Sequence, residues 1–246
     1  MQAHSASSRF ARLSPHLRGH LLLFDRRSSQ EPDPASATRL LLIYLFLEAA
    51  LGPRLSILGW FHLPAVSSWI RVPGLIVLAL LLVRFVARLT PARIGLYGWH
   101  AWSTTERSYF VQAFCLGNGV FIFVFAHRLR AIASDPSLWG AACATMLTYL
   151  AWGAYQELAY RGILQTALVS RLGPAAGILI ANTVFTFGPL HFYHFASGSP
   201  LPMFAGIFTI GLFFSVLFWR SGNLWLVGVL HGLGDGYIDG LRLVVK

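Results

Sequence analysis

Apolar stretches without formal charge alternate with short arginine-bearing segments along most of the chain. No Asp, Glu, Lys or Arg occurs in residues 108–127 or in residues 136–156. Each stretch is long enough for one membrane crossing, because a helix needs roughly 20 apolar residues to span the hydrocarbon core. The uncharged interval 172–219 is much longer and contains Ser197-Gly198-Ser199-Pro200, a turn signal that predicts two helices joined by a loop.

Further apolar stretches lie on both sides of these segments. Residues about 40–60 and 66–87 are poorer candidates because charged side chains interrupt them, and residues 223–234 form a final stretch. The predicted fold class is therefore all-α: a polytopic membrane helix bundle of about six to eight transmembrane helices. The expected parts are a polar, Arg-rich N-terminal tail (1–38), N-terminal transmembrane helices (39–137) and a helix bundle that carries the chemistry (138–246).

Composition and charge support a membrane protein. The chain has 246 residues, of which 56% are hydrophobic, and 19 Lys and Arg stand against 9 Asp and Glu. This composition excludes an ordinary soluble domain, and we interpret the basic excess as contacts with anionic lipid and as a determinant of orientation, with no nucleic-acid partner. With a cytosolic tail and seven crossings, 13 of the basic residues fall on the inner side.

Four places in the apolar spans carry ionisable residues, which are costly in hydrocarbon and usually face the bundle interior. They are Glu48, the pair Glu157 and Arg161, the pair His191 and His194, and the pair His231 and Asp235. Each has a structural interpretation as well. The first pair has helical spacing for a self-neutralising ion pair, a histidine on an apolar face is often only a hydrogen-bond donor, and the last pair could close a helix end. For the isolated Glu48, snorkelling to the interface is favoured.

The predicted depths of these groups favour a common site. Depths were measured from turns near 172–174 and 221–222 at about 1.5 Å per residue. Five of these residues lie within about 15–28 Å of the same membrane side: Glu157, Arg161, His191, His231 and Asp235. We expect Pro189 to kink its helix and to bring His191 nearer to the others. Three independent segments with ionisable groups at similar depth predict a shared pocket.

The ordered motifs resemble those of the CPBP intramembrane proteases. They are Glu157-x-x-x-Arg161-Gly162, Phe187-x-x-x-His191, a helix beginning near Phe208 with Gly211, and His231-x-x-x-Asp235, which together cover about residues 138–240. The family includes CAAX prenyl endopeptidases, bacteriocin-processing and immunity proteins, and peptidases that act on C-terminal anchor segments. The resemblance implies a multi-pass protein of the bacterial cell membrane that acts on a membrane-anchored protein substrate.

The resemblance also implies glutamate-type proteolysis that needs no metal or other cofactor. A carboxylate and a histidine would activate water, and donors would stabilise the developing oxyanion. His191 would partner the base and bind water, His231 would donate to the oxyanion with Asp235 beside it, and Arg161 would fix Glu157. Gln156, Tyr160 and Phe187 are expected to contact the substrate.

One position departs from the family pattern. The family usually has two adjacent glutamates, of which the first is generally the base, but this chain has Gln156 there. An amide cannot accept a proton from water. Either Glu157 takes over as the base of an active endopeptidase, or the protein is a non-hydrolytic relative that binds a peptide or confers immunity. The estimated depth places the site toward the outer side, which suits the C-terminal anchors of exported proteins.

A metal-dependent hydrolase is a further alternative. His191, His194, His231 and Asp235 have side chains that bind zinc or iron, although no His-Glu-x-x-His helix is present. Metal analysis of the purified protein distinguishes this class from the metal-independent one.

Overall fold

The computed structural model describes residues 32–51, 68–196 and 200–245, and this part of the chain contains helices and no strand. The α-helices are α2 (Pro34–Leu51), α3 (Ser68–Phe85), α4 (Thr104–Val124), α5 (Ala126–Ser134), α6 (Trp139–Glu157), α7 (Thr166–Phe187), α8 (Pro200–Ser221), α9 (Leu224–Asp235) and α10 (Leu241–Val244). Two π-helical segments, η6 (Leu158–Gln165) and η8 (Gly236–Gly240), follow α6 and α9. Short 3₁₀ turns are η3 (Pro91–Ile94), η4 (Trp99–Ala101), η5 (Pro136–Leu138) and η7 (Phe192–Ala196).

The all-α prediction is confirmed. Within the described ranges, three helical segments are long and apolar enough to cross a membrane: Thr104–Val124, Pro136–Phe187 and Pro200–Ser221. The second contains two of the predicted crossings, because the chain reverses within it. The predicted loop at 197–199 and the tail at 1–31 lie outside the described residues.

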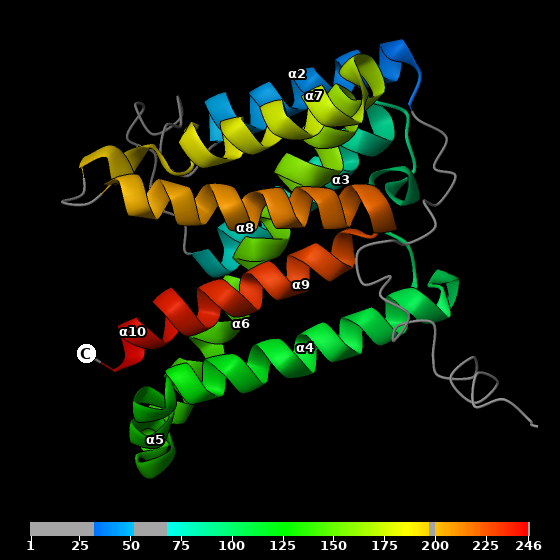
Figure 1. Cartoon of the computed structure of the whole chain (residues 1–246). Coiled ribbons are helices and arrows are strands. Elements are labelled where there is room, and N and C mark those ends of the chain that lie inside the picture. Colours follow the sequence, from blue (N-terminus) through cyan, green and yellow to red (C-terminus); the bar gives the residue numbers. More distant parts are fainter. Residues whose placement is uncertain (1–31, 52–67, 197–199, 246) are drawn as a thin grey trace, which may run out of the picture.

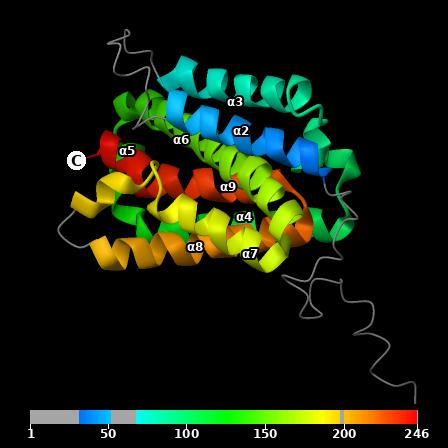
Figure 2. The same cartoon turned by 90° about the horizontal axis from the view of Figure 1, so that it is seen from above.

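The long helices run alternately between the two ends of the bundle (Figures 1 and 2). At one end, Arg171 donates a hydrogen bond to the Pro34 carbonyl at the start of α2 (3.2 Å). At the same end, the Leu224 amide at the start of α9 donates to the Gly95 carbonyl between α3 and α4 (3.0 Å). The start of α2, the turn that holds Arg171, the connection between α3 and α4 and the start of α9 therefore lie at one end, and the C-terminus lies at the other (Figure 1).

Local residue chemistry explains where the first helix begins. The Asp33 Oδ1 atom accepts hydrogen bonds from the amides of Ala35 and Ser36 (3.0 Å each), which satisfies donors that a helix start leaves unpaired. Pro34 occupies the first helical position, where its missing N–H costs nothing. Helix α2 therefore starts several residues before the predicted span at about 40.

Two glycines make the predicted reversals at this end. Gly173 (φ 78°) interrupts the helical run before Pro174, and Gly222 (φ 64°) separates α8 from α9. Both adopt left-handed backbone conformations that other residues rarely tolerate. The turns predicted near 172–174 and 221–222 are thus confirmed.

The predicted kink at Pro189 is wrong. Helix α7 ends at Phe187, and Gly188 is extended (φ −83°, ψ −169°). A residue that precedes proline is driven away from helical geometry, so the helix stops instead of bending. His191 consequently lies in the turn that follows α7 and not on a continuing helix.

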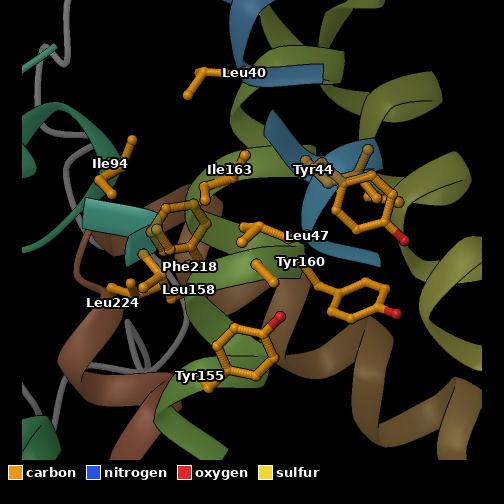
Figure 3. Packing of buried hydrophobic residues seen from close by; sticks show 14 of the residues in the cluster. Leu40, Tyr44, Leu47, Ile94, Tyr155, Leu158, Tyr160, Ile163, Phe218 and Leu224 are labelled. Carbon is orange, nitrogen blue, oxygen red and sulfur yellow. The ribbon is translucent and has the colours of Figure 1, made fainter. Parts of the chain in front are cut away.

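The centre of the bundle is the junction of α6 and η6. Every residue from 155 to 165 is buried, so this segment is covered on all faces. Figure 3 shows side chains of α2, including Leu40 and Leu47, beside Leu158 and Ile163 of this segment, with Ile94 and Leu224 from other parts of the chain. Charged residues in the segment therefore lack direct access to lipid.

Glycines bring α6 and α9 into close contact. A Cβ atom on Gly153 would lie 2.4 Å from the Gly232 nitrogen, and one on Gly232 would lie 2.7 Å from the Leu150 Cα atom. Small residues allow such backbone approach between membrane helices. Gly153 and Gly232 stand near the ends of their helices that carry the ionisable residues, so the contact sets the separation of those residues.

A buried carboxylate joins the starts of α4 and α9. Glu106 forms a capping box with Ser103, accepting from the Ser103 amide at 2.6 Å. The other Glu106 oxygen accepts from the Tyr97 hydroxyl (2.5 Å) and from Asn223 Nδ2 (3.2 Å). Because Asn223 caps α9, Glu106 fixes the position at which that helix enters the bundle. The sequence interpretation did not single out this residue.

Candidate active site

The two π-helical segments each begin directly after a candidate site residue. Glu157 is the last residue of α6 before η6, and Asp235 is the last residue of α9 before η8. A π-helical turn contains an extra residue and changes the direction of the side chains around it, and such turns are common at functional sites. The helix geometry therefore changes directly after Glu157, at Leu158, and directly after Asp235, at Gly236.

Glu157 and Arg161 form the predicted ion pair in the protein interior. Arg161 Nη1 donates to Glu157 Oε1 at 3.0 Å, and the two side chains are 1% and 0% exposed. Arg161 Nη2 donates to the Gly211 carbonyl of α8 (2.9 Å), and its guanidinium lies 4.1 Å from the centre of the Phe185 ring. Arg161 thus connects α6 with α7 and α8.

His231 extends this pair to a second carboxylate. Its Nδ1 atom lies 2.6 Å from Glu157 Oε1, and its Nε2 atom lies 3.6 Å from Asp235 Oδ2. A carboxylate oxygen accepts hydrogen bonds, so Nδ1 carries a proton. The predicted proximity of His231 and Asp235 is confirmed, and Glu157 lies within reach of the same histidine.

Gln156 closes the chain of polar contacts. Its Nε2 atom donates to Asp235 Oδ2 at 3.3 Å. Gln156 and Glu157 are adjacent, yet both side chains reach α9, one at Asp235 and the other at His231. The site therefore contains a continuous series of contacts from Gln156 through Asp235, His231 and Glu157 to Arg161.

His191 joins the group through an aromatic side chain. Its Nδ1 atom lies 2.7 Å from the Phe185 carbonyl, which only accepts, so Nδ1 is the protonated nitrogen. In the neutral ring Nε2 then carries a lone pair. The Phe185 ring packs edge-on against both imidazoles, with centroid distances of 4.8 Å to His191 and 5.9 Å to His231. The Phe185 ring therefore lies between the two imidazoles and contacts both of them.

The other two predicted substrate contacts lie in different surroundings. Tyr160 is 1% exposed and packs edge-on between Tyr44 (5.4 Å) and Phe185 (5.2 Å). Phe187 is more exposed and packs 5.1 Å from Phe204, near the start of α8. Their predicted contact with a substrate stays a prediction.

The interpretation of Glu48 as a snorkelling residue is wrong. Its side chain is 5% exposed, in the helix face that contributes Tyr44 to the core. Burial occurs because α2 packs against η6 and α7, which the spacing of charges along the chain did not indicate. Figure 3 shows Tyr44, Tyr155 and Tyr160 in the adjoining core.

Helix α8 is held against the site by donors from other helices. In addition to Arg161 at Gly211, Asn182 Nδ2 donates to the Phe208 carbonyl (3.0 Å) and Gln165 Nε2 donates to the Ser215 carbonyl (2.8 Å). All three carbonyls lie on one face of α8. The sequence interpretation missed Asn182 and Gln165, although uncharged amides in an apolar helix are a signal of interhelical hydrogen bonding.

Replacing Gly211 by alanine is expected to disturb the site. The new Cβ atom would lie 2.4 Å from Asn182 Oδ1 and 3.2 Å from Arg161 Nη2, so both side chains must move. Overpacking of this kind costs about 1–3 kcal/mol. The measurement is the thermal midpoint in detergent, with Gly206→Ala on the same helix as the control, because its Cβ atom would meet nothing within 4 Å. Equal midpoints for the two variants would contradict the close packing of α8.

The arrangement of possible metal-ligating side chains bears on the metal-dependent alternative. Among the described side chains, no group of three or more His, Cys, Asp and Glu residues is arranged to hold a metal ion. The His194 side chain lies outside the described set. The contacts of His231 with two carboxylates instead resemble a hydrogen-bonded acid–base network.

Comparison with known proteins supports the family resemblance. The family model for type II CAAX prenyl endopeptidase Rce1-like proteins matches residues 136–237, from η5 to η8. The matched segment includes all five predicted catalytic residues, which are Glu157, Arg161, His191, His231 and Asp235. No curated protein and no solved structure matches the chain. Residues 136–237 of this chain are thus similar to the type II CAAX prenyl endopeptidase Rce1-like family, the CPBP group.

Proposed function

We propose that this protein is an intramembrane endopeptidase that hydrolyses a peptide bond of a membrane-anchored protein near its C-terminal anchor. The observation that carries the proposal is the contact of Glu157, His231 and Asp235, contributed by two helices, inside an apolar bundle. Ionisable groups are costly at such a position, and chemistry is the usual reason that they occur there. The family match over the same residues supports the same class of reaction.

The contacts match what peptide hydrolysis requires. A base must take a proton from the attacking water, and donors must face the developing oxyanion. His191 Nε2 carries the lone pair that can accept a hydrogen bond from water, because Nδ1 is bonded to the Phe185 carbonyl. His231 donates its Nδ1–H to Glu157, which Arg161 also contacts, so both side chains are fixed in the site. The sequence hypothesis gives the base role to Glu157.

The topology supports a site that opens toward the outer side of the membrane. In the orientation favoured by the arginine distribution, the end where Gly173 and Gly222 turn the chain is cytosolic. Helix α9 enters from that end, and the site residues lie toward its other end. A bacterial cell-membrane enzyme that trims the C-terminal anchors of exported proteins fits this arrangement.

Reconstituted full-length protein tests the function. Liposomes would contain the protein and a panel of fluorescently tagged single-span proteins with randomised residues beside the span. Wild-type protein is expected to release the tag, and His231→Ala and His191→Ala are each expected to lower turnover by at least about 100-fold, the usual contribution of acid–base groups. The control is His127→Ala, which removes an exposed histidine of α5.

The outcomes separate the alternatives. Binding of tagged proteins without cleavage would indicate the non-hydrolytic relative that Gln156 suggests. Stoichiometric zinc or iron in the purified protein, together with loss of turnover on chelation, would indicate the metal-dependent class. Turnover that survives both site substitutions would place the chemistry elsewhere and overturn the proposal.

A further inference from the structure

We infer that the water-activating base of this site is Asp235 on α9, with Gln156 on α6 as its hydrogen-bonding partner and as a donor to the oxyanion. This inference rests on the proposed endopeptidase function and assigns the proton transfer to a residue other than Glu157. It follows from the different surroundings of the two carboxylates that contact His231.

Glu157 is buried and contacts two cationic or polar side chains through one of its oxygens. Its side chain is 0% exposed, and Oε1 accepts from Arg161 Nη1 (3.0 Å) and from His231 Nδ1 (2.6 Å). The positive guanidinium of Arg161 compensates the charge of this carboxylate, and both donors contact the same oxygen. Its second oxygen, Oε2, is buried without a hydrogen-bond partner among the described residues. A water molecule would have to enter a closed core to reach Glu157.

Asp235 is the more accessible carboxylate. Its side chain is 26% exposed, and its nearest cation is the His231 imidazole at 3.6 Å. Both polar contacts of Asp235, with Gln156 Nε2 and His231 Nε2, involve Oδ2. Within the described part of the chain, Oδ1 is not engaged in either contact, so it is available to a water molecule.

Gln156 is placed to complement this carboxylate. A side-chain amide has two N–H groups, and one of them is directed at Asp235 Oδ2 (3.3 Å). The second N–H is not used in that contact. A carbonyl positioned beside Asp235 would therefore meet one amide donor and one base.

The proposed step conserves atoms and charge. Asp235 takes one proton from water while the water oxygen bonds to the scissile carbonyl carbon and the C=O electron pair moves to oxygen. The second N–H of Gln156 stabilises that oxyanion. The C=O bond then re-forms, the C–N bond breaks, and the proton moves from Asp235 to the leaving nitrogen, giving a carboxylic acid and an amine.

The distance between Gln156 and Asp235 depends on the glycine contact between α6 and α9. Gly153 lies one turn before Gln156, and Gly232 lies one turn before Asp235. Their backbones touch, since a Cβ atom on Gly153 would be 2.4 Å from the Gly232 nitrogen. At this helix separation the short aspartate side chain can reach the glutamine across the interface.

Exchange of the two side chains tests the assignment. Asp235→Asn keeps an oxygen acceptor for Gln156 but removes the base, and it is expected to lower kcat by at least about 100-fold with little change in KM. The double variant Gln156→Glu/Asp235→Asn returns one carboxylate and one amide to the same contact. It is expected to recover kcat to within about 10-fold of wild type, since the base is restored across the interface.

Asp239→Asn provides the matched control. Asp239 lies one turn further along, is 49% exposed and pairs with Arg242 at 3.8 Å, so its loss should leave turnover unchanged. The assay uses the full chain and the tagged single-span panel in liposomes, and thermal midpoints confirm that each variant is folded.

The possible failures are distinguishable. Turnover by Asp235→Asn within threefold of wild type, or an exchange variant as inactive as Asp235→Asn, would overturn the assignment to Asp235 while the endopeptidase function stands. Absence of cleavage by wild-type protein across the panel would overturn the proposed function and, with it, this assignment.

Discussion

Replacing Arg161 by leucine is expected to destabilise the protein by about 3–5 kcal/mol, the cost of leaving one member of a buried ion pair without its partner. Glu157 would remain in a closed core with its charge uncompensated, since both side chains are almost fully buried. The substitution also removes the donor to the Gly211 carbonyl and the cation over the Phe185 ring. The measurement is the free energy of unfolding in detergent, together with the yield of folded protein.

Two further variants show whether the loss arises from the unpaired charge. Arg171→Leu removes an arginine from the same helical run, but its side chain is exposed and contacts only the start of α2, so the expected cost is below about 1 kcal/mol. The double variant Glu157→Gln/Arg161→Met removes both charges and should recover about 2 kcal/mol or more, because apolar replacements of buried pairs are often tolerated. Equal stability of Arg161→Leu and Arg171→Leu would contradict a structural role for the ion pair.

Local sequence signals predicted the pairs of site residues correctly. Spacing of four residues placed Arg161 beside Glu157 and Asp235 beside His231, and the structure confirms both proximities. Glycine turns at 173 and 222 were also recognisable, because glycine with proline or serine interrupts apolar helices. These features depend on neighbouring residues of one segment and are therefore accessible from sequence.

Contacts between segments were not predictable in the same way. The position of Phe185 between the two histidines depends on where α7 ends, and the expected kink at Pro189 gave a different path for His191. Burial of Glu48 depends on packing of α2 against the central segment, which no local pattern reveals. The π-helical segments after Glu157 and Asp235 are likewise a response to packing, since their sequences carry no proline that would force a change of helix geometry.

In the proposed mechanism, the buried Glu157 positions His231 and the more accessible Asp235 takes the proton from water. One carboxylate could not do both, because the first role requires burial and the second requires contact with water. Glu157 is held by Arg161 and keeps His231 in place, and its side chain is 0% exposed. A base must instead meet water and exchange a proton. A glutamine at position 156 is then compatible with an active enzyme, because the carboxylate that meets water stands on the opposite helix.

Replacing Gly153 by alanine is expected to abolish turnover and to lower stability by about 1–3 kcal/mol or more, the cost of overpacking a closely packed interface. The new Cβ atom would lie 2.4 Å from the Gly232 nitrogen and 2.5 Å from its Cα atom, so the backbones of α6 and α9 must separate. Separation would lengthen the Gln156–Asp235 and Glu157–His231 contacts, which cross the same interface. A misplacement of about 1 Å can lower the rate by about 100-fold.

The chain offers a control on the same helix. Gly140→Ala adds the same methyl group to α6, but its Cβ atom would meet nothing within 4 Å, and alanine favours a helix over glycine by about 1 kcal/mol. We therefore expect Gly140→Ala to equal or exceed wild type in stability and to retain turnover. Because the two substitutions are chemically identical, any difference between them reports on the α6–α9 contact alone. Wild-type turnover in Gly153→Ala would show that the site tolerates separation of the helices and would remove the structural basis for placing the base on α9.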